Sequence, residues 1–109
     1  MGKIESIAKN VEKKKEAPIL KLIHSKDKSV QLAAIEALGK VGKDDSFNAL
    51  IVLLTDDDAD VREAAVKALG EMGNDHARAH LQHALSKENN AKVEAALKHA
   101  IEQLRNARD

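Results

Sequence analysis

The sequence contains no cysteine, which excludes a disulfide framework, a thiolate metal site and a cysteine nucleophile. It also lacks tryptophan and tyrosine, so Phe47 is the only aromatic residue. Because proteins stack exposed nucleic-acid bases on aromatic side chains, this composition argues against a single-strand binding surface. With one proline, Pro18, and five glycines, little of the chain resembles a flexible linker.

Neither sign of charge is in excess, because 18 lysine and arginine residues balance 18 aspartate and glutamate residues. Such a chain creates no long-range field that would attract nucleic acid or an anionic membrane. No apolar run reaches the roughly 18 residues of a membrane-spanning helix, and the N-terminal stretch lacks the apolar segment of a signal peptide. We therefore expect a cytoplasmic protein that binds neither nucleic acid nor a membrane.

What the chain does contain is a repeated segment: DKSVQLAAIEALGKVG at residues 27–42 and DDDADVREAAVKALGEMG at residues 56–73. In both copies apolar residues recur at i, i+3, i+4, i+7, i+8 and i+11, which is one face of an α-helix. These positions are Val30, Ala33, Ala34, Ala37, Leu38 and Val41, then Val61, Ala64, Ala65, Ala68, Leu69 and Met72, with an offset of 31. A fixed period of this length predicts stacked repeats.

A third copy aligns with the second at an offset of either 31 or 32. The offset of 31 matches Glu94-Ala95-Ala96 with Glu63-Ala64-Ala65, whereas the offset of 32 keeps the apolar face. We choose 32, because the extra residue then falls in the polar segment SKENN, where insertions are tolerated. The third apolar face is Val93, Ala96, Leu97, Ala100, Ile101 and Leu104.

A shorter apolar segment precedes each of these helices, so each repeat is predicted to be a helical hairpin, with a first helix A and a second helix B. Asp27, Asp58 and Asn90 stand where a side-chain oxygen can cap each B helix, and Gly42 and Gly73 fit left-handed C-terminal caps. The A segments are Ile19, Leu22 and Ile23, then Leu50, Leu53 and Leu54, then Leu81, Ala84 and Leu85.

Two further glycines, Gly39 and Gly70, lie inside the last turn of a B helix, where glycine costs about 1 kcal/mol relative to alanine. We expect the following A helix to approach closely at these positions. The third copy has Glu102 in place of Gly70.

These patterns predict an all-α fold, an α-solenoid of antiparallel helical hairpins with about seven helices. We expect a single domain over residues 1–109, with a capping helix in residues 1–15 and hairpins at residues 16–42, 47–73 and 76–105. The cap is an amphipathic segment with Ile4, Ile7, Ala8 and Val11 on one side.

The segment DDDADVREAAVKALGEMG resembles a HEAT repeat, specifically the short HEAT-like type associated with phycobilisome lyases, and the resemblance covers roughly residues 16–105. That family mostly supplies binding surfaces, with bilin lyases, metal-dependent deoxyhypusine hydroxylases and DNA-repair glycosylases as enzyme branches. The Asp and Arg pairing typical of the family is present only as Asp58 with Arg62, because Gln31 and Glu94 occupy the Arg62 position elsewhere. We therefore expect helix packing, rather than a continuous ionic ladder, to hold the array together.

A candidate metal site is His76, His80 and His83, because imidazoles at i and i+4 on a helix can share a zinc ion. The alternative is a polar flank on the outer layer of helices. The hydroxylase branch uses His-Glu pairs, and this sequence contains no such dipeptide. We therefore expect no bound metal and no cofactor. The carboxylates of Asp56, Asp57, Asp58 and Asp60 could hold a calcium ion, but we interpret them as a helix start, because the glycine and the terminal glutamate of a calcium loop are missing.

The predicted function is a noncatalytic protein–protein interaction scaffold or adaptor, whose partner binds the concave surface of the B helices. By helical angle, the side chains on that surface are Leu32, Glu36, Glu63, Lys67 and His99. The alternative is an accessory subunit of a lyase-like or other protein-modifying enzyme. No residue pattern indicates a catalytic site of the chain's own.

Overall fold

The computed structural model describes residues 2–107. Within these residues it contains seven helices and no strand, which confirms the predicted all-α class. The helices are α1 (Lys3–Glu12), α2 (Glu16–Leu20), α3 (Lys28–Val41), α4 (Asp44–Leu53), α5 (Ala59–Met72), α6 (Ala77–Lys87) and α7 (Ala91–Ala107). In the part of the chain that the structure describes, no helix is both long and apolar enough to cross a bilayer.

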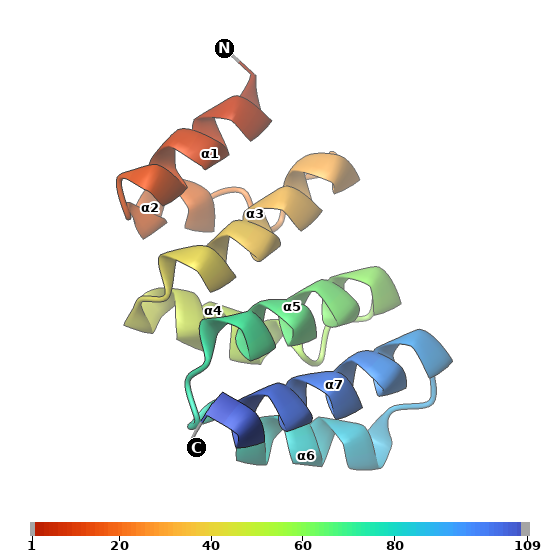
Figure 1. Cartoon of the computed structure of the whole chain (residues 1–109). Helices are drawn as coiled ribbons and strands as arrows, with labels where there is room; N and C mark the ends of the chain where they lie inside the picture. Colours follow the sequence, from red (N-terminus) through yellow and green to blue (C-terminus); the bar gives the residue numbers. More distant parts are fainter. Residues whose placement is uncertain (1, 108–109) are drawn as a thin grey trace.

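The helices form two layers (Figure 1). The B helices α3, α5 and α7 lie side by side, with α1 next to α3, while the A helices α2, α4 and α6 lie behind them. The molecule is only 17 Å thick along its shortest axis, which suits two layers of helices about 10 Å across. Each A helix therefore has the B helices on one side and solvent on the other.

The helix ends follow the predicted caps. The side-chain oxygens of Asp27, Asp58 and Asn90 accept hydrogen bonds of 2.8 to 3.4 Å from backbone N–H groups in the first turn of the helix that follows. Gly42 and Gly73 end α3 and α5 with φ angles of 71° and 75°, the left-handed conformation that a glycine adopts without steric cost. Local chemistry thus fixes where the B helices begin and where α3 and α5 end.

The third apolar face is buried as the offset of 32 predicts. Val93, Leu97 and Leu104 are at most 1% exposed. The offset of 31 would instead have placed Lys92 and Ala95 on the inner face, and both are exposed. The inserted residue therefore lies between α6 and α7, and the B helix keeps its register against the core.

Gly39 and Gly70 each lie close to a neighbouring helix, but the prediction that this neighbour is the following A helix is wrong. A Cβ atom on Gly39 would lie 2.8 Å from the carbonyl oxygen of Ala68, and one on Gly70 would lie 3.0 Å from the Cβ of Ala100. Both contacts are with the next B helix rather than with the following A helix. The glycines therefore let α3 approach α5 and let α5 approach α7.

The N-terminal helix α1 packs against α3 and α2. Ile7 is its only buried residue, Val11 is partly buried and Ile4 is 50% exposed. We interpret α1 as the capping helix, which covers the free side of α3 and leaves part of its own apolar side at the surface.

Candidate interaction surface

Four of the five side chains predicted on the B helices line one groove. Leu32 and Glu36 come from α3, and Glu63 and Lys67 come from α5. His99 is exposed on α7 but does not line this groove. We call this hollow of about 360 Å³ the B groove; its residues are Leu32, Glu36, Asp60, Glu63, Ala64, Lys67, Ala68 and Glu71.

Half of these residues were not predicted from the sequence. Asp60 and Glu71 follow from the helical spacing, because they lie three residues before Glu63 and four residues after Lys67 on the same side of α5. Ala64 and Ala68 were assigned to the core face, and they form the wall of the groove beside Glu63 and Lys67. Extending the i, i+3, i+4 pattern along α5 would have found the two carboxylates.

Small side chains and exposed ion pairs shape the B groove. The close approach of Gly39 to Ala68 holds α3 and α5 together at its base. On the rim, Glu36 pairs with Lys40 at 3.4 Å and Glu63 pairs with Lys67 at 3.6 Å. Such exposed pairs along one helix contribute only about 0.3 to 0.5 kcal/mol each, so these side chains are free to exchange partners.

A row of charges runs along the N-terminal ends of the three B helices. The Lys28 ammonium lies 3.0 Å from Asp58 and 2.7 Å from Asp60, and Lys92 lies 3.6 Å from the other oxygen of Asp60. The bonds from Lys28 lower the pKa of the Asp58 and Asp60 carboxyls, and they raise the pKa of Lys28. We call these four residues the charge row.

The charge row links α3, α5 and α7 by ion pairs at this end of the helices. These side chains are exposed, and exposed pairs contribute little to stability, so helix packing stays the expected source of cohesion in the array. The charge row was not predicted, because it does not involve the Arg62 position or its counterparts Gln31 and Glu94. The available signal was that Lys28, Asp60 and Lys92 recur at intervals of 32 residues with alternating charge.

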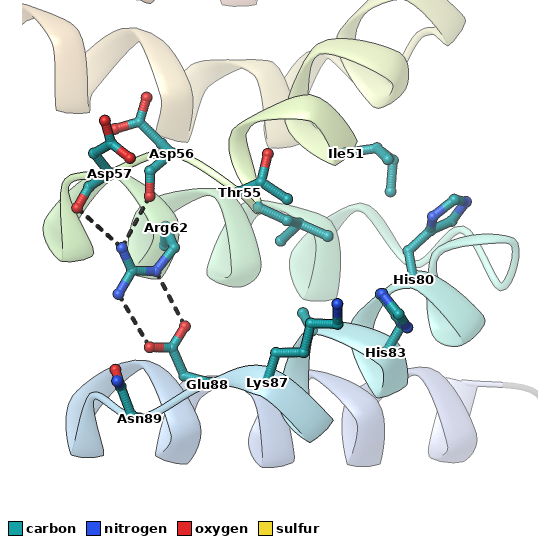
Figure 2. Close-up of a pocket in the computed structure, with 12 residues that line it drawn as sticks. Ile51, Thr55, Asp56, Asp57, Arg62, His80, His83, Lys87, Glu88 and Asn89 are labelled. Carbon is teal, nitrogen blue, oxygen red and sulfur yellow. Dashed lines mark hydrogen bonds and ion pairs between the residues drawn. The ribbon is translucent and has the colours of Figure 1, made fainter.

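A larger hollow of about 520 Å³ lies on the other side of the molecule, between α4 and α6 (Figure 2). Ile51, Leu54 and Ala84 give it apolar walls. Figure 2 shows His80, His83 and Lys87 along α6, away from the acidic side chains that precede α5. We call it the A groove; its other residues are Thr55, Asp56, Asp57, Arg62, Glu88 and Asn89.

Arg62 and Glu88 form a largely buried ion pair in the A groove. The guanidinium donates to both carboxylate oxygens at 3.1 and 3.0 Å, and the side chains are 18% and 7% exposed. Arg62 also donates to the backbone carbonyls of Asp56 and Asp57. Hydrogen bonding to Arg62 lowers the pKa of the Glu88 carboxyl, so the pair stays ionised at neutral pH.

The three histidines proposed as a metal site do not share one cavity. His80 and His83 line the A groove, whereas His76 precedes the first residue of α6 and lies in a different hollow beside Phe47. Within residues 2–107, no three His, Cys, Asp or Glu side chains are grouped to hold a metal ion. The structure therefore does not bring these three histidines together, and their interpretation as a polar flank stays a prediction.

The acidic run before α5 acts as a helix start. Asp56 Oδ2 accepts a hydrogen bond of 2.9 Å from the backbone N–H of Asp58, whose own carboxylate caps α5. Ser25 and Glu88 make the same contact before the other two B helices, with the N–H groups of Asp27 and Asn90. The carboxylate oxygens of Asp56 and Asp58 therefore accept hydrogen bonds from backbone N–H groups, as expected for a helix start.

The family model described as HEAT repeats matches residues 16–102, a range that contains α2 to α6 and most of α7. A comparison with curated proteins finds no similar sequence.

Proposed function

Because the chain belongs to the HEAT-repeat family, whose repeats generally mediate protein–protein interaction, we propose that it is a noncatalytic scaffold or adaptor. A partner protein binds the exposed face of the B helices. The observation that carries this proposal is that Leu32, Glu36, Glu63 and Lys67, singled out from helical spacing alone, line one groove. We propose that α1 and the three hairpins act in this as one domain.

The packing of the two layers supports the B face as the concave one. In the described residues, α3 packs extensively on α5 and α5 on α7, while α4 and α6 barely contact each other. The A groove opens in the space between α4 and α6. A stack that is tighter on one side curves toward that side, and repeat proteins use such inner surfaces for binding.

The charge of the B groove supports a protein partner rather than a nucleic acid or a membrane. Phosphate groups bind where lysine and arginine side chains neutralise them, and carboxylates dominate the lining of this groove. Preformed helices also lose little conformational entropy when a partner docks, which favours affinity.

Affinity capture from the native cell extract tests the proposal. The bait is compared with a triple variant on the B face, Glu36→Ala, Lys67→Ala and His99→Ala. The matched control is Lys21→Ala, Asn48→Ala and Gln82→Ala, three exposed polar residues elsewhere on the surface. We expect the first variant alone to lose a stoichiometric partner, and retention of every partner by a folded triple variant would contradict the proposal.

The same capture addresses the second candidate function, an accessory subunit of a lyase-like or other protein-modifying enzyme. That candidate rests on the resemblance of DDDADVREAAVKALGEMG to the short repeats of the phycobilisome lyase type. Turnover of a protein substrate by the captured complex, or a chromophore bound to it, would favour the accessory role. A stoichiometric complex without either would favour the scaffold.

A further inference from the structure

The B groove carries an excess of negative charge, although the whole chain is neutral. Its lining holds four carboxylates, Glu36, Asp60, Glu63 and Glu71, and one ammonium group, that of Lys67. Asp60 is already paired within the charge row. The other three carboxylates face the groove along both of its sides.

These three carboxylates are available to a partner. Glu36 and Glu63 pair only with the exposed Lys40 and Lys67. Glu36 is exposed and Glu63 is partly buried, with 22% of its side chain exposed, and such pairs along one helix contribute little. Glu71 is exposed and forms no ion pair with any residue in the range 2–107. A cation on a partner therefore gains these contacts without breaking a buried bond.

The shape of the groove fits a helix. It lies between two neighbouring helices of 14 residues each, which are about 21 Å long. Leu32 and Ala64 give it a small apolar surface, with the buried Ala68 beneath them. A helix packs its ridge of side chains into such a space between two others. Glu63 and Glu71 are eight residues apart on α5, about 12 Å or just over two turns.

We infer that the B groove binds a basic amphipathic helix of the partner protein. A stripe of apolar residues on that helix packs against Leu32 and Ala64. Lysine or arginine side chains two turns apart pair with Glu63 and Glu71. This inference rests on the proposed function and gives the chemistry of the partner at the same surface.

The test uses three synthetic helical peptides of equal length. All carry the same stripe of leucine and alanine, and the flanking positions are lysine in one, glutamine in the second and glutamate in the third. Binding to the full chain is measured by titration calorimetry, and the site is mapped by NMR shifts of methyl groups. We expect the lysine peptide to bind at least about tenfold more tightly than the glutamate peptide, with shifts at Leu32 and Ala64.

A charge swap makes the result specific. In the variant Glu63→Lys with Glu71→Lys, the order of the lysine and glutamate peptides should reverse. The control is Asp45→Lys with Asp57→Lys, which makes the same change of charge at exposed residues outside the B groove. It should keep the original order, and circular dichroism verifies that both variants remain helical.

The inference is overturned if the glutamine or glutamate peptide binds as well as the lysine peptide, or if the control variant also reverses the order. Shifts confined to Ile4 and Ala8 would place the peptide in the neighbouring groove between α1 and α3, which also contradicts it. These outcomes leave a B-face scaffold possible for partners of other chemistry. Loss of the proposed function itself would appear as intact capture by the triple alanine variant.

Discussion

Arg62 on α5 and Glu88 at the end of α6 form two parallel hydrogen bonds, Nε to Oε1 at 3.1 Å and Nη2 to Oε2 at 3.0 Å. Glu88 also accepts a bond from the backbone N–H of Asn90, the cap of α7. One carboxylate therefore joins the second hairpin to the start of the last helix. The charge row makes a second link at the same ends of the B helices.

Replacing Arg62 with methionine should destabilise the protein by about 1 to 3 kcal/mol, because it leaves a largely buried carboxylate without its partner. Arg62→Lys should lose a substantial part of the same free energy, since an ammonium group cannot bind both oxygens in the fork geometry. Urea denaturation of the three proteins measures the change. An unfolding midpoint of Arg62→Met equal to that of the wild type would contradict this role.

The Arg62–Glu88 pair also predicts a pH dependence. The pKa of Glu88 is lower in the folded protein than in the unfolded chain, so the stability from this pair is present above the unfolded pKa, near 4.3. It is lost as the pH falls through the folded pKa. The stability of the wild type should exceed that of Glu88→Gln at pH 7, and the difference should shrink below about pH 4. Thermal unfolding of both proteins across this range checks it, and a constant difference would count against the prediction.

The contact between α3 and α5 predicts that Gly39→Ala is destabilising, although alanine is the better helix former by about 1 kcal/mol. The new Cβ would lie 2.8 to 2.9 Å from backbone and side-chain atoms of Ala68, and overpacking of this kind costs typically about 1 to 3 kcal/mol.

Gly70→Ala is the internal comparison for Gly39→Ala. Its nearest obstacles are the end of the flexible Gln103 side chain and the Cβ of Ala100 at 3.0 Å. The Gln103 side chain can move away, and the contact with Ala100 needs a smaller displacement than the contacts of 2.8 to 2.9 Å with Ala68, so Gly70→Ala should cost less. Denaturation of the two variants in parallel decides the order, and the opposite order would show that the α3–α5 contact is not the tighter one.

The cap of α7 predicts different results for two adjacent asparagines. Asn90 Oδ1 accepts bonds from the backbone N–H groups of Lys92 at 2.9 Å and Val93 at 3.1 Å. Asn90→Ala should therefore cost about 1 kcal/mol. Asn89 is exposed, and within the described part of the chain its side chain makes no such bond. Asn89→Ala should change the unfolding midpoint little, and equal losses from both variants would exclude a specific cap at Asn90.

The sequence predicted the features that depend on local chemistry. The apolar spacing gave the buried face of each B helix, including Val93 and Leu97 after the one-residue insertion. Short polar side chains before a helix and glycines after it predicted the caps, because the hydrogen bonds of a cap join residues only two to four positions apart. Leu32, Glu36, Glu63 and Lys67 could be placed on one side for the same reason.

The contacts between distant residues were less predictable. A glycine within a helix indicates a close neighbour, but its position does not say whether that neighbour is the next A helix or the next B helix. Arg62 and Glu88 are 26 residues apart, and the insertion before α7 obscures which residues correspond. Comparing Ser25, Asp56 and Glu88 would have shown the correspondence, because each accepts a hydrogen bond from the backbone N–H of a cap residue.

The central claim is that a partner protein docks on the face of the B helices. Photocrosslinking measures this most directly, with benzoylphenylalanine placed at Leu32 in the B groove or at Val52, which is 70% exposed on α4 in the other layer. We predict a protein adduct from position 32 alone, and competition by excess wild-type chain but not by the Glu36, Lys67 and His99 triple variant. An adduct of the same partner from position 52 alone, or equal adducts from both positions, would contradict the claim.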